Sequence, residues 1–318
     1  MSRPRRDHAL GVACVLGASV LWGTTGTASA LAPSVAPLAV GAASMGFGGL
    51  LLAGTASRQI ARHRRALVRS WPVVAAGGTA VLVYALTFYT SMRLAGVAVG
   101  TAVSIGGAPV AARVLERLVE GRRLSARWTA GAVAGIAGAV LLCLSRGTGA
   151  APGAGEAAQT LAGVALGAAA AASYALYSFT CHRLIRSGVG DRAALGATFA
   201  VAAVGLLTVL ACTGGAFLVS WGNAAVGAYL AVVPMFLGYV LFGWGLARVP
   251  ASVATTASLA EPVVAAVLAV ALVGERLAPA GWAGMALILV GLAVLTVPLP
   301  ALAGRRCRAS AEAARMEG

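Results

Sequence analysis

Long apolar runs separated by short polar segments constrain this chain more than any other feature of its sequence. Each run is about 20 residues long, the length of a helix that spans a hydrocarbon core of about 30 Å. Strands of a membrane barrel would instead alternate apolar and polar residues over about ten residues. The sequence therefore predicts an all-α membrane protein with ten transmembrane helices, at residues 8–31, 35–56, 70–92, 97–117, 127–145, 159–181, 192–213, 223–246, 251–272 and 281–300.

The composition agrees with a chain that lies almost wholly in a bilayer. Hydrophobic residues make up 59% of its 318 residues and charged residues 10%, whereas a soluble domain has roughly 25% charged residues. The mean hydropathy is +0.88. Nothing between the apolar runs is long enough to form a soluble domain.

The net charge of +15 comes with 24 basic residues, all of them arginine. A basic surface is typical of nucleic-acid-binding proteins, but here the arginines alternate between loops, as the positive-inside rule requires. We therefore expect a lipid bilayer and no nucleic acid as partner, in the plasma (inner) membrane, with both termini cytoplasmic. The rich segments are Arg3–Arg6, Arg58–Arg69, Arg122–Arg127, Arg183–Arg192 and Arg305–Arg315, and the other loops hold Arg93, Arg146 and Arg276.

Sequence features of enzymes, pumps and metal proteins are missing. The five cysteines show neither a disulfide framework nor metal-ligand spacing. His8, His63 and His182 fall in tails or at span ends, so neither a buried Ser-His pair nor a histidine metal site is expected. No Walker sequence and no GxGxxG in a strand-helix context occurs. We expect no cofactor, no metal, no catalytic residue and no ATP-driven activity from this chain alone.

An internal repeat divides the chain. When the sequence is shifted by 153 residues, IGGAPVAARVLERLVEGRRL (105–124) falls on SLAEPVVAAVLAVALVGERL (258–277), so that Pro109 meets Pro262; at a shift of 152, Trp22 meets Tyr174. Each copy holds five spans, an odd number, so the copies should have opposite orientations in the membrane. Such inverted repeats are common in secondary transporters. The predicted units are residues 1–145, an external linker 146–158, residues 159–300 and a cytoplasmic tail 301–318.

The sequence also contains two local motifs. One is LWG in the first span, and the other is a Glu-Pro pair inside the ninth span with Gly-Glu just after its end. With the ten spans and the five-plus-five repeat, they resemble the EamA-like transporter family of the drug/metabolite transporter superfamily over nearly the whole chain. The first copy departs from the pattern, with Ala108 where the second has Glu261. The resemblance implies transport of small metabolites such as amino acids, often coupled to protons. The motif residues are Leu21, Trp22, Gly23, Glu261, Pro262, Gly274 and Glu275.

Prolines inside the fourth and ninth spans, and a glutamate inside the ninth, are energetically unfavourable in a membrane helix. Pro109 and Pro262 lack an amide proton and are expected to break or kink their helices, which would free the carbonyl groups of Ile105 and Ser258. The kinks could line a cavity or serve packing alone. Glu261 lies about ten residues into its span, roughly 15 Å deep, where a charge costs at least about 2.5 kcal/mol. It is either functional or a neutral or paired structural residue.

Arg113 is a candidate partner of Glu261. Its position lies about 24 Å down the fourth span, so its side chain could equally extend to the cytoplasmic surface. The sequence leaves both alternatives open.

Aromatic residues recur toward the middle of the predicted spans, where rings with a polar group can bind a small organic molecule. Helix packing and anchoring at the membrane surface are the alternatives. Small-residue spacings such as Gly131, Gly135 and Gly138 permit close helix contacts within one chain or in a homodimer. The candidate substrate-binding residues are Trp22, Tyr84, Phe88, Tyr174, Tyr177, Tyr239, Ser258 and Glu261.

Together these features predict a secondary transporter that moves a small organic metabolite by alternating access. The substrate would be an amino acid, a related compound or a drug-like compound. A lipid-carrier flippase and a non-transporting membrane scaffold or sensor are the alternatives. Substrate identity, import against export, proton or ion coupling and oligomeric state are not fixed by the sequence.

Overall fold

The computed structural model describes residues 3–120, parts of 130–141, 154–246, residue 248 and residues 260–296. All regular structure in these ranges is helical. Seven helices are long and apolar enough to cross a membrane, and two shorter apolar helices cover Ala260–Val273 and Pro279–Gly291. An all-helical protein with multiple apolar helices is therefore confirmed. The predicted span 127–145 and the start of 251–272 lie largely outside the described residues, so the count of ten stays a prediction.

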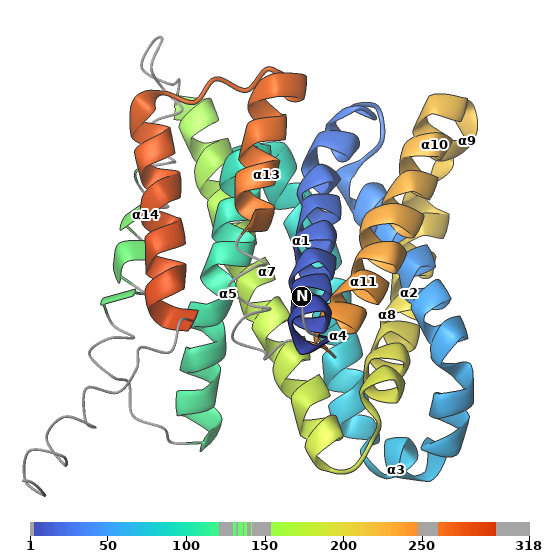
Figure 1. Ribbon diagram of the computed structural model, residues 1–318. Helices are drawn as coiled ribbons and strands as arrows, with labels where there is room; N and C mark the ends of the chain where they lie inside the picture. The colour runs from blue at the N-terminus through green and yellow to red at the C-terminus, as the bar shows by residue number, and fades with distance from the viewer. Residues whose placement is uncertain are drawn as a thin grey trace, which may run out of the picture.

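The helices stand side by side in one bundle (Figure 1). The short helix α3 lies at its lower end in that view and α9 at its upper end. In chain order the elements are α1 (Arg3–Ala30), α2 (Pro37–Arg62), α3 (Arg64–Arg69), α4 (Trp71–Ala95), α5 (Val97–Glu120), α7 (Ala154–Arg186), α8 (Asp191–Thr213), α9 (Gly215–Val219), α10 (Trp221–Leu230), η2 (Ala231–Leu237), α11 (Gly238–Leu246), α13 (Ala260–Leu268), η3 (Ala269–Val273) and α14 (Pro279–Thr296).

Proline and glycine mark several helix ends. Pro37 and Pro72 stand in the first turns of α2 and α4, where the missing amide proton removes no helical hydrogen bond. Gly96, between α4 and α5, has φ +84°, and Gly274, after η3, has φ +78°. Side chains disfavour such positive φ values, so glycine permits these two tight reversals.

Two π-helical turns interrupt the second half of the bundle. η2 contains Pro234, and η3 ends at Gly274; π-helical turns are frequent at functional sites. At the predicted breaks, helix α5 runs through Pro109 without a gap, and Pro262 stands in the first turn of α13. Bends at these two prolines stay predictions.

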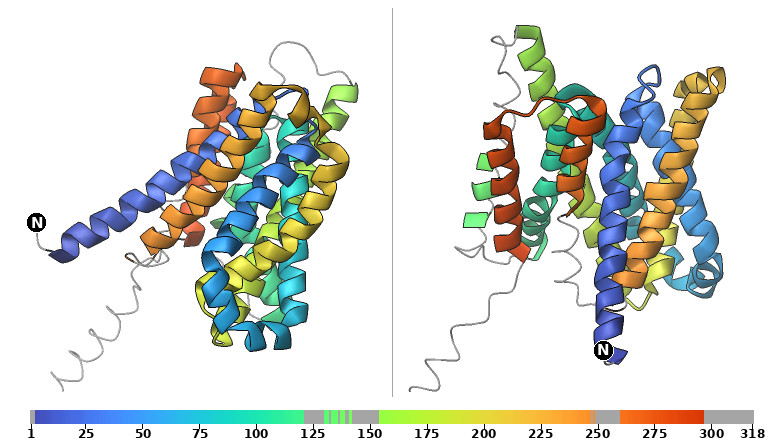
Figure 2. Two further views of the ribbon diagram at one scale, coloured as in Figure 1. Left: turned by 90° about the vertical axis from the view of Figure 1, so that its right-hand side faces the viewer. Right: turned by 45° about the horizontal axis from the view of Figure 1, so that its top comes forward.

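Helix contacts come in pairs that the repeat relates. Helix α1 packs against α13 and α11, and α7, which corresponds to α1 in the second copy, packs against α5 and α4. Because α5 corresponds to α13 and α4 to α11, each contact has a counterpart. The position of α1 between α13 and α11 is visible in Figures 1 and 2.

The glycines of α14 show the same relation at atomic scale. A Cβ atom on Gly138 would lie 2.6 Å from the carbonyl oxygen of Gly284, and one on Gly291 would lie 2.7 Å from that of Gly131. The repeat shift carries Gly138 onto Gly291 and Gly131 onto Gly284, so one contact maps onto the other. These glycines serve packing within the chain, and the predicted homodimer is not tested.

Two charged side chains form hydrogen bonds with backbone groups at the upper end of the bundle. Arg93 donates hydrogen bonds to the carbonyl oxygens of Pro33 (3.0 Å) and Val35 (2.9 Å), so this exception to the arginine bias holds the turn between α1 and α2. The carboxylate of Glu275 accepts from the backbone N–H groups of Val97 (2.6 Å) and Ala98 (3.3 Å). Glu275 therefore caps the start of α5, in the other half of the chain, and stabilises the positive end of that helix.

Replacing Glu275 by alanine should lower the free energy of unfolding by about 1–2 kcal/mol, the usual value of a helix cap. Thermal unfolding of the purified protein in detergent measures the change. The neighbouring exposed Arg276 offers a matched control, because Arg276→Ala removes a charge without removing the cap. Equal melting temperatures for Glu275→Ala and Arg276→Ala would mean that the cap contributes nothing.

Candidate functional site

Aromatic rings from five helices form one continuous cluster, which we call the aromatic cluster. It runs from α11 and α1 through α8 and α7 to α4. Neighbouring ring centroids are 4.9 to 6.4 Å apart, within the range in which aromatic side chains attract each other. Its members, in order of contact, are Phe242, Trp22, Tyr239, Phe199, Tyr177, Tyr174, Tyr84, Phe88 and Tyr89.

The two halves of the chain meet inside this cluster. Tyr84 of α4 lies edge-on to Tyr174 of α7, with 5.7 Å between ring centroids, and stacks on Phe88 at 5.3 Å. On the other side Trp22 of α1 lies edge-on to Tyr239 of α11, at 5.3 Å. Both pairs join a ring of the first half to a ring of the second.

The rings in the middle of the cluster are buried, and those at its margin are partly accessible. Phe199, Tyr177 and Tyr84 are buried, and the hydroxyl groups of Tyr177 and Tyr239 lie 3.3 Å apart, at hydrogen-bond distance. Tyr174, Tyr239 and Trp22 keep part of their surface accessible. Accessible aromatic surface of the cluster is therefore found on Trp22, Tyr174 and Tyr239.

Glu261 lies in the first turn of α13 and is 8% exposed. Helix α1 reaches it through Gly23, since a Cβ atom there would lie 2.7 Å from the Cβ of Val264 and 3.1 Å from the carbonyl oxygen of Glu261. The glycine that follows Trp22 thus lets α1 approach the turn that carries the glutamate. This close approach gives the LWG sequence a structural role.

The Glu261 carboxyl group lacks a counter-charge in the described part of the chain. No hydrogen bond or ion pair joins it to a described residue, and the other buried polar side chains there are serines and threonines. It is near enough to Tyr84, Tyr174 and Tyr239 to interact electrostatically with their hydroxyl groups. A carboxylate buried in this way needs either a proton or a cation.

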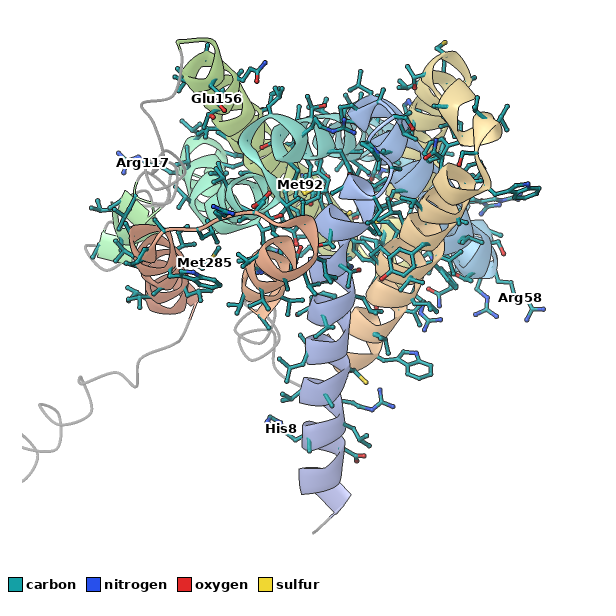
Figure 3. The ribbon with its side chains drawn as sticks, turned by 90° about the horizontal axis from the view of Figure 1, so that it is seen from above. His8, Arg58, Met92, Arg117, Glu156 and Met285 are labelled. Carbon is teal, nitrogen blue, oxygen red and sulfur yellow. The ribbon has the colours of Figure 1, made fainter. Side chains whose placement is uncertain are left out.

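The candidate partner Arg113 has its side chain outside the described residues, and Ser258 lies outside them altogether. The arginines and histidines whose side chains are described lie near helix ends or in the segments between helices. Seen from above, His8, Arg58 and Arg117 lie at the outer margin and Met92 in the interior (Figure 3). In the described ranges, no group of three or more His, Cys, Asp and Glu side chains is placed to hold a metal ion.

A hollow lies away from the aromatic cluster, at the lower end of the bundle, between α5 and α7. Phe179, His182, Arg183 and Arg186 line it along one face of α7, together with Val119. Its three basic residues are exposed, and basic residues are common at the C-terminal end of a helix because they interact favourably with its dipole. The aromatic cluster, with its buried carboxylate, is therefore the better candidate site.

Seven of the eight predicted substrate-binding residues come together around the aromatic cluster. They are Trp22, Tyr84, Phe88, Tyr174, Tyr177, Tyr239 and Glu261. The sequence prediction omitted Phe199, Phe242 and Tyr89, which belong to the same network. Phe199 is fully buried and is the sole aromatic residue of the predicted span 192–213, a signal that could have identified it.

One buried donor in the cluster has no acceptor among the described residues. The indole Nε1 of Trp22 makes no hydrogen bond to any of them, and it packs so closely on Gly238 that a Cβ atom there would lie 2.6 Å away. A buried Trp N–H usually finds a partner.

Comparisons with known proteins show what this chain is similar to as a whole. Residues 9–144 and 161–297 each match the EamA-like transporter family. The chain is 34% identical over 305 residues to "Uncharacterized transporter YwfM" of Bacillus subtilis (strain 168), covering 95% of this chain and 97% of the relative. A solved crystal structure with 23% sequence identity has a TM-score of 0.58 and covers 90% of this chain and 96% of its own. That structural likeness concerns the fold alone.

Proposed function

Since the chain belongs to the EamA-like transporter family of membrane proteins, we propose that it is a secondary transporter that moves a small organic metabolite by alternating access. One observation carries this proposal: rings from both halves of the chain form one aromatic cluster, beside a buried carboxyl group that has no partner among the described residues. In transporters built from repeats, the substrate site lies where the halves meet. Rocking of one half against the other would then expose the same side chains to each side in turn.

Ten spans in two inverted five-helix repeats are part of the proposal. The paired helix contacts and the reciprocal glycine contacts of α14 support it. The two matched segments, 9–144 and 161–297, are of similar length and account for most of the chain. An odd number of spans in each half would place the halves upside down relative to one another.

Flux measurements test the transport function directly. The purified chain would be reconstituted in vesicles and offered amino acids, sugars and cationic drugs, with and without a pH gradient. We expect saturable uptake of at least one class, and a dependence on the gradient if protons are coupled. Folded protein that moves no compound in either direction would contradict the proposal and favour a scaffold or sensor.

For orientation, we expect both termini and the arginine-rich Arg58–Arg69 segment to face the cytoplasm of a cell whose inner membrane holds the protein. Single cysteines introduced near Gly155 and near His63 would be treated with a membrane-impermeant thiol reagent in intact cells, in a background without the native cysteines. The site near Gly155 should react and the site near His63 should not. The reverse labelling pattern would show that the orientation is wrong.

Removing the ring of Trp22 should weaken substrate transport while folded protein persists in the membrane. Trp22 lines the accessible margin of the cluster, and aromatic contact area of this kind contributes about 0.5–1.5 kcal/mol beyond burial. Trp71 is 55% exposed at the start of α4 and gives the matched control. Equal losses of transport and of folded protein for Trp22→Ala and Trp71→Ala would favour a packing role.

A further inference from the structure

Among the described side chains, the charges around the candidate site have one sign. Glu261 is the one buried acidic or basic side chain of the described residues; the other buried ionisable groups there are tyrosines and Cys181. The sequence has no lysine, and the arginines and histidines whose side chains are described lie near helix ends or in the segments between helices. The side chain of Arg113, inside α5, is not among them. Arg93, at the upper end of α4, is engaged by the carbonyl groups of Pro33 and Val35. No described cation faces the carboxyl group.

The aromatic cluster, like the carboxyl group of Glu261, favours a positively charged ligand. Trp22, Tyr174 and Tyr239 keep part of their surface accessible, and a cation within about 6 Å of a ring centroid is attracted by the electron-rich face of the ring. Gly23, the residue after Trp22, lies against the turn that carries Glu261, since a Cβ atom there would lie 3.1 Å from the Glu261 carbonyl oxygen. The carboxyl group and the rings therefore share one neighbourhood.

Resting on the transport function proposed above, we propose that this site selects a monovalent organic cation, an amine with a flat apolar body, over zwitterions and anions. The ammonium group pairs with Glu261, and the apolar body packs against the rings. An amino acid would bring a second carboxylate into this neighbourhood, where no described cation would pair with it. Burial of an unpaired charge is strongly unfavourable.

Three probes with the same ring separate these cases: phenethylamine is a cation, phenylalanine a zwitterion and 3-phenylpropionate an anion near neutral pH. Binding to the purified chain would be measured by isothermal titration calorimetry, and movement by flux in vesicles. We expect phenethylamine to bind about tenfold or more tightly than phenylalanine, a difference of about 1.4 kcal/mol. We expect no saturable binding of 3-phenylpropionate.

Variants identify the group responsible. Glu261→Gln should remove most of the preference for phenethylamine, and Glu261→Asp, which keeps the charge, should retain it. Glu156, exposed at the start of α7 (Figure 3), supplies the control: Glu156→Gln should bind as the parent does. Gel filtration would show that each variant is folded.

The outcomes distinguish this inference from the proposed function. Phenylalanine or 3-phenylpropionate binding as tightly as phenethylamine would overturn the inference, and so would absent binding of all three probes or an unchanged preference in Glu261→Gln. If amino acids are transported and phenethylamine is not bound, transport stands and the cation selectivity fails. If phenethylamine binds selectively but no compound crosses the vesicle membrane, the site stands and the transport function fails.

Discussion

Glu261→Gln is expected to abolish most pH-dependent transport while the protein still inserts and folds. Glutamine has nearly the size and hydrogen-bonding capacity of glutamate, but it carries no charge and exchanges no proton at any working pH. Glu261 is 8% exposed and has no partner among the described residues. Its carboxyl group can therefore bind either a cationic substrate or a proton. A loss of about tenfold or more is expected, equivalent to about 1.4 kcal/mol.

Flux against an imposed pH gradient measures this effect, with the amount of folded protein checked by gel filtration. Glu156→Gln changes an exposed acidic residue outside the site and should keep the parental profile. The mechanism would be wrong if Glu261→Gln transports at the parental rate with the parental pH dependence, because the carboxyl group would then be structural.

Most helix positions could be predicted from hydropathy, because a bilayer accepts only segments that satisfy their own backbone hydrogen bonds. The run at 192–213 became α8, Asp191–Thr213. By contrast, α7 extends from Ala154 to Arg186, beyond the predicted 159–181. Hydropathy detects only the apolar part of a helix, and backbone hydrogen bonding continues into the arginine-bearing turns.

Two features of the second half of the bundle could not be predicted from the residue pattern. The π-helical turn around Pro234 depends on how the freed backbone groups are satisfied by neighbouring helices, which no local pattern records. The role of Glu275 was also hidden, because its partners Val97 and Ala98 are far away in the chain. Contacts between distant segments are set by packing.

The candidate site was partly predictable for a related reason. Trp22 and Tyr174 occupy equivalent positions in the two copies, and this correspondence identified both as site candidates. Which rings touch is a different matter: Trp22 contacts Tyr239 and Phe242, while Tyr174 contacts Tyr84 and Tyr177. The repeat relates these two neighbourhoods, but the connection between them through Phe199 requires the three-dimensional structure.

Gly23→Ala is expected to damage both the stability and the transport activity of the protein. The added methyl group would lie 2.7 Å from the Cβ and Cγ1 atoms of Val264 and 3.1 Å from the carbonyl oxygen of Glu261. Helices α1 and α13 would have to separate there, and overpacking of this kind costs about 1–3 kcal/mol. The separation would also move Glu261 away from Trp22, so transport should fall together with stability.

Gly17, on the same helix, isolates the packing effect. A Cβ atom there would meet only Leu241, at 3.7 Å, an ordinary contact distance. Both substitutions gain the helix preference of alanine over glycine, about 0.5–1 kcal/mol, so Gly17→Ala should be neutral or slightly stabilising. The difference between the two variants in thermal unfolding and in flux therefore reports the contact between α1 and α13. If Gly23→Ala melts and transports like Gly17→Ala, α1 does not approach Glu261 closely in the working protein, and the close contact inferred for Gly23 is wrong.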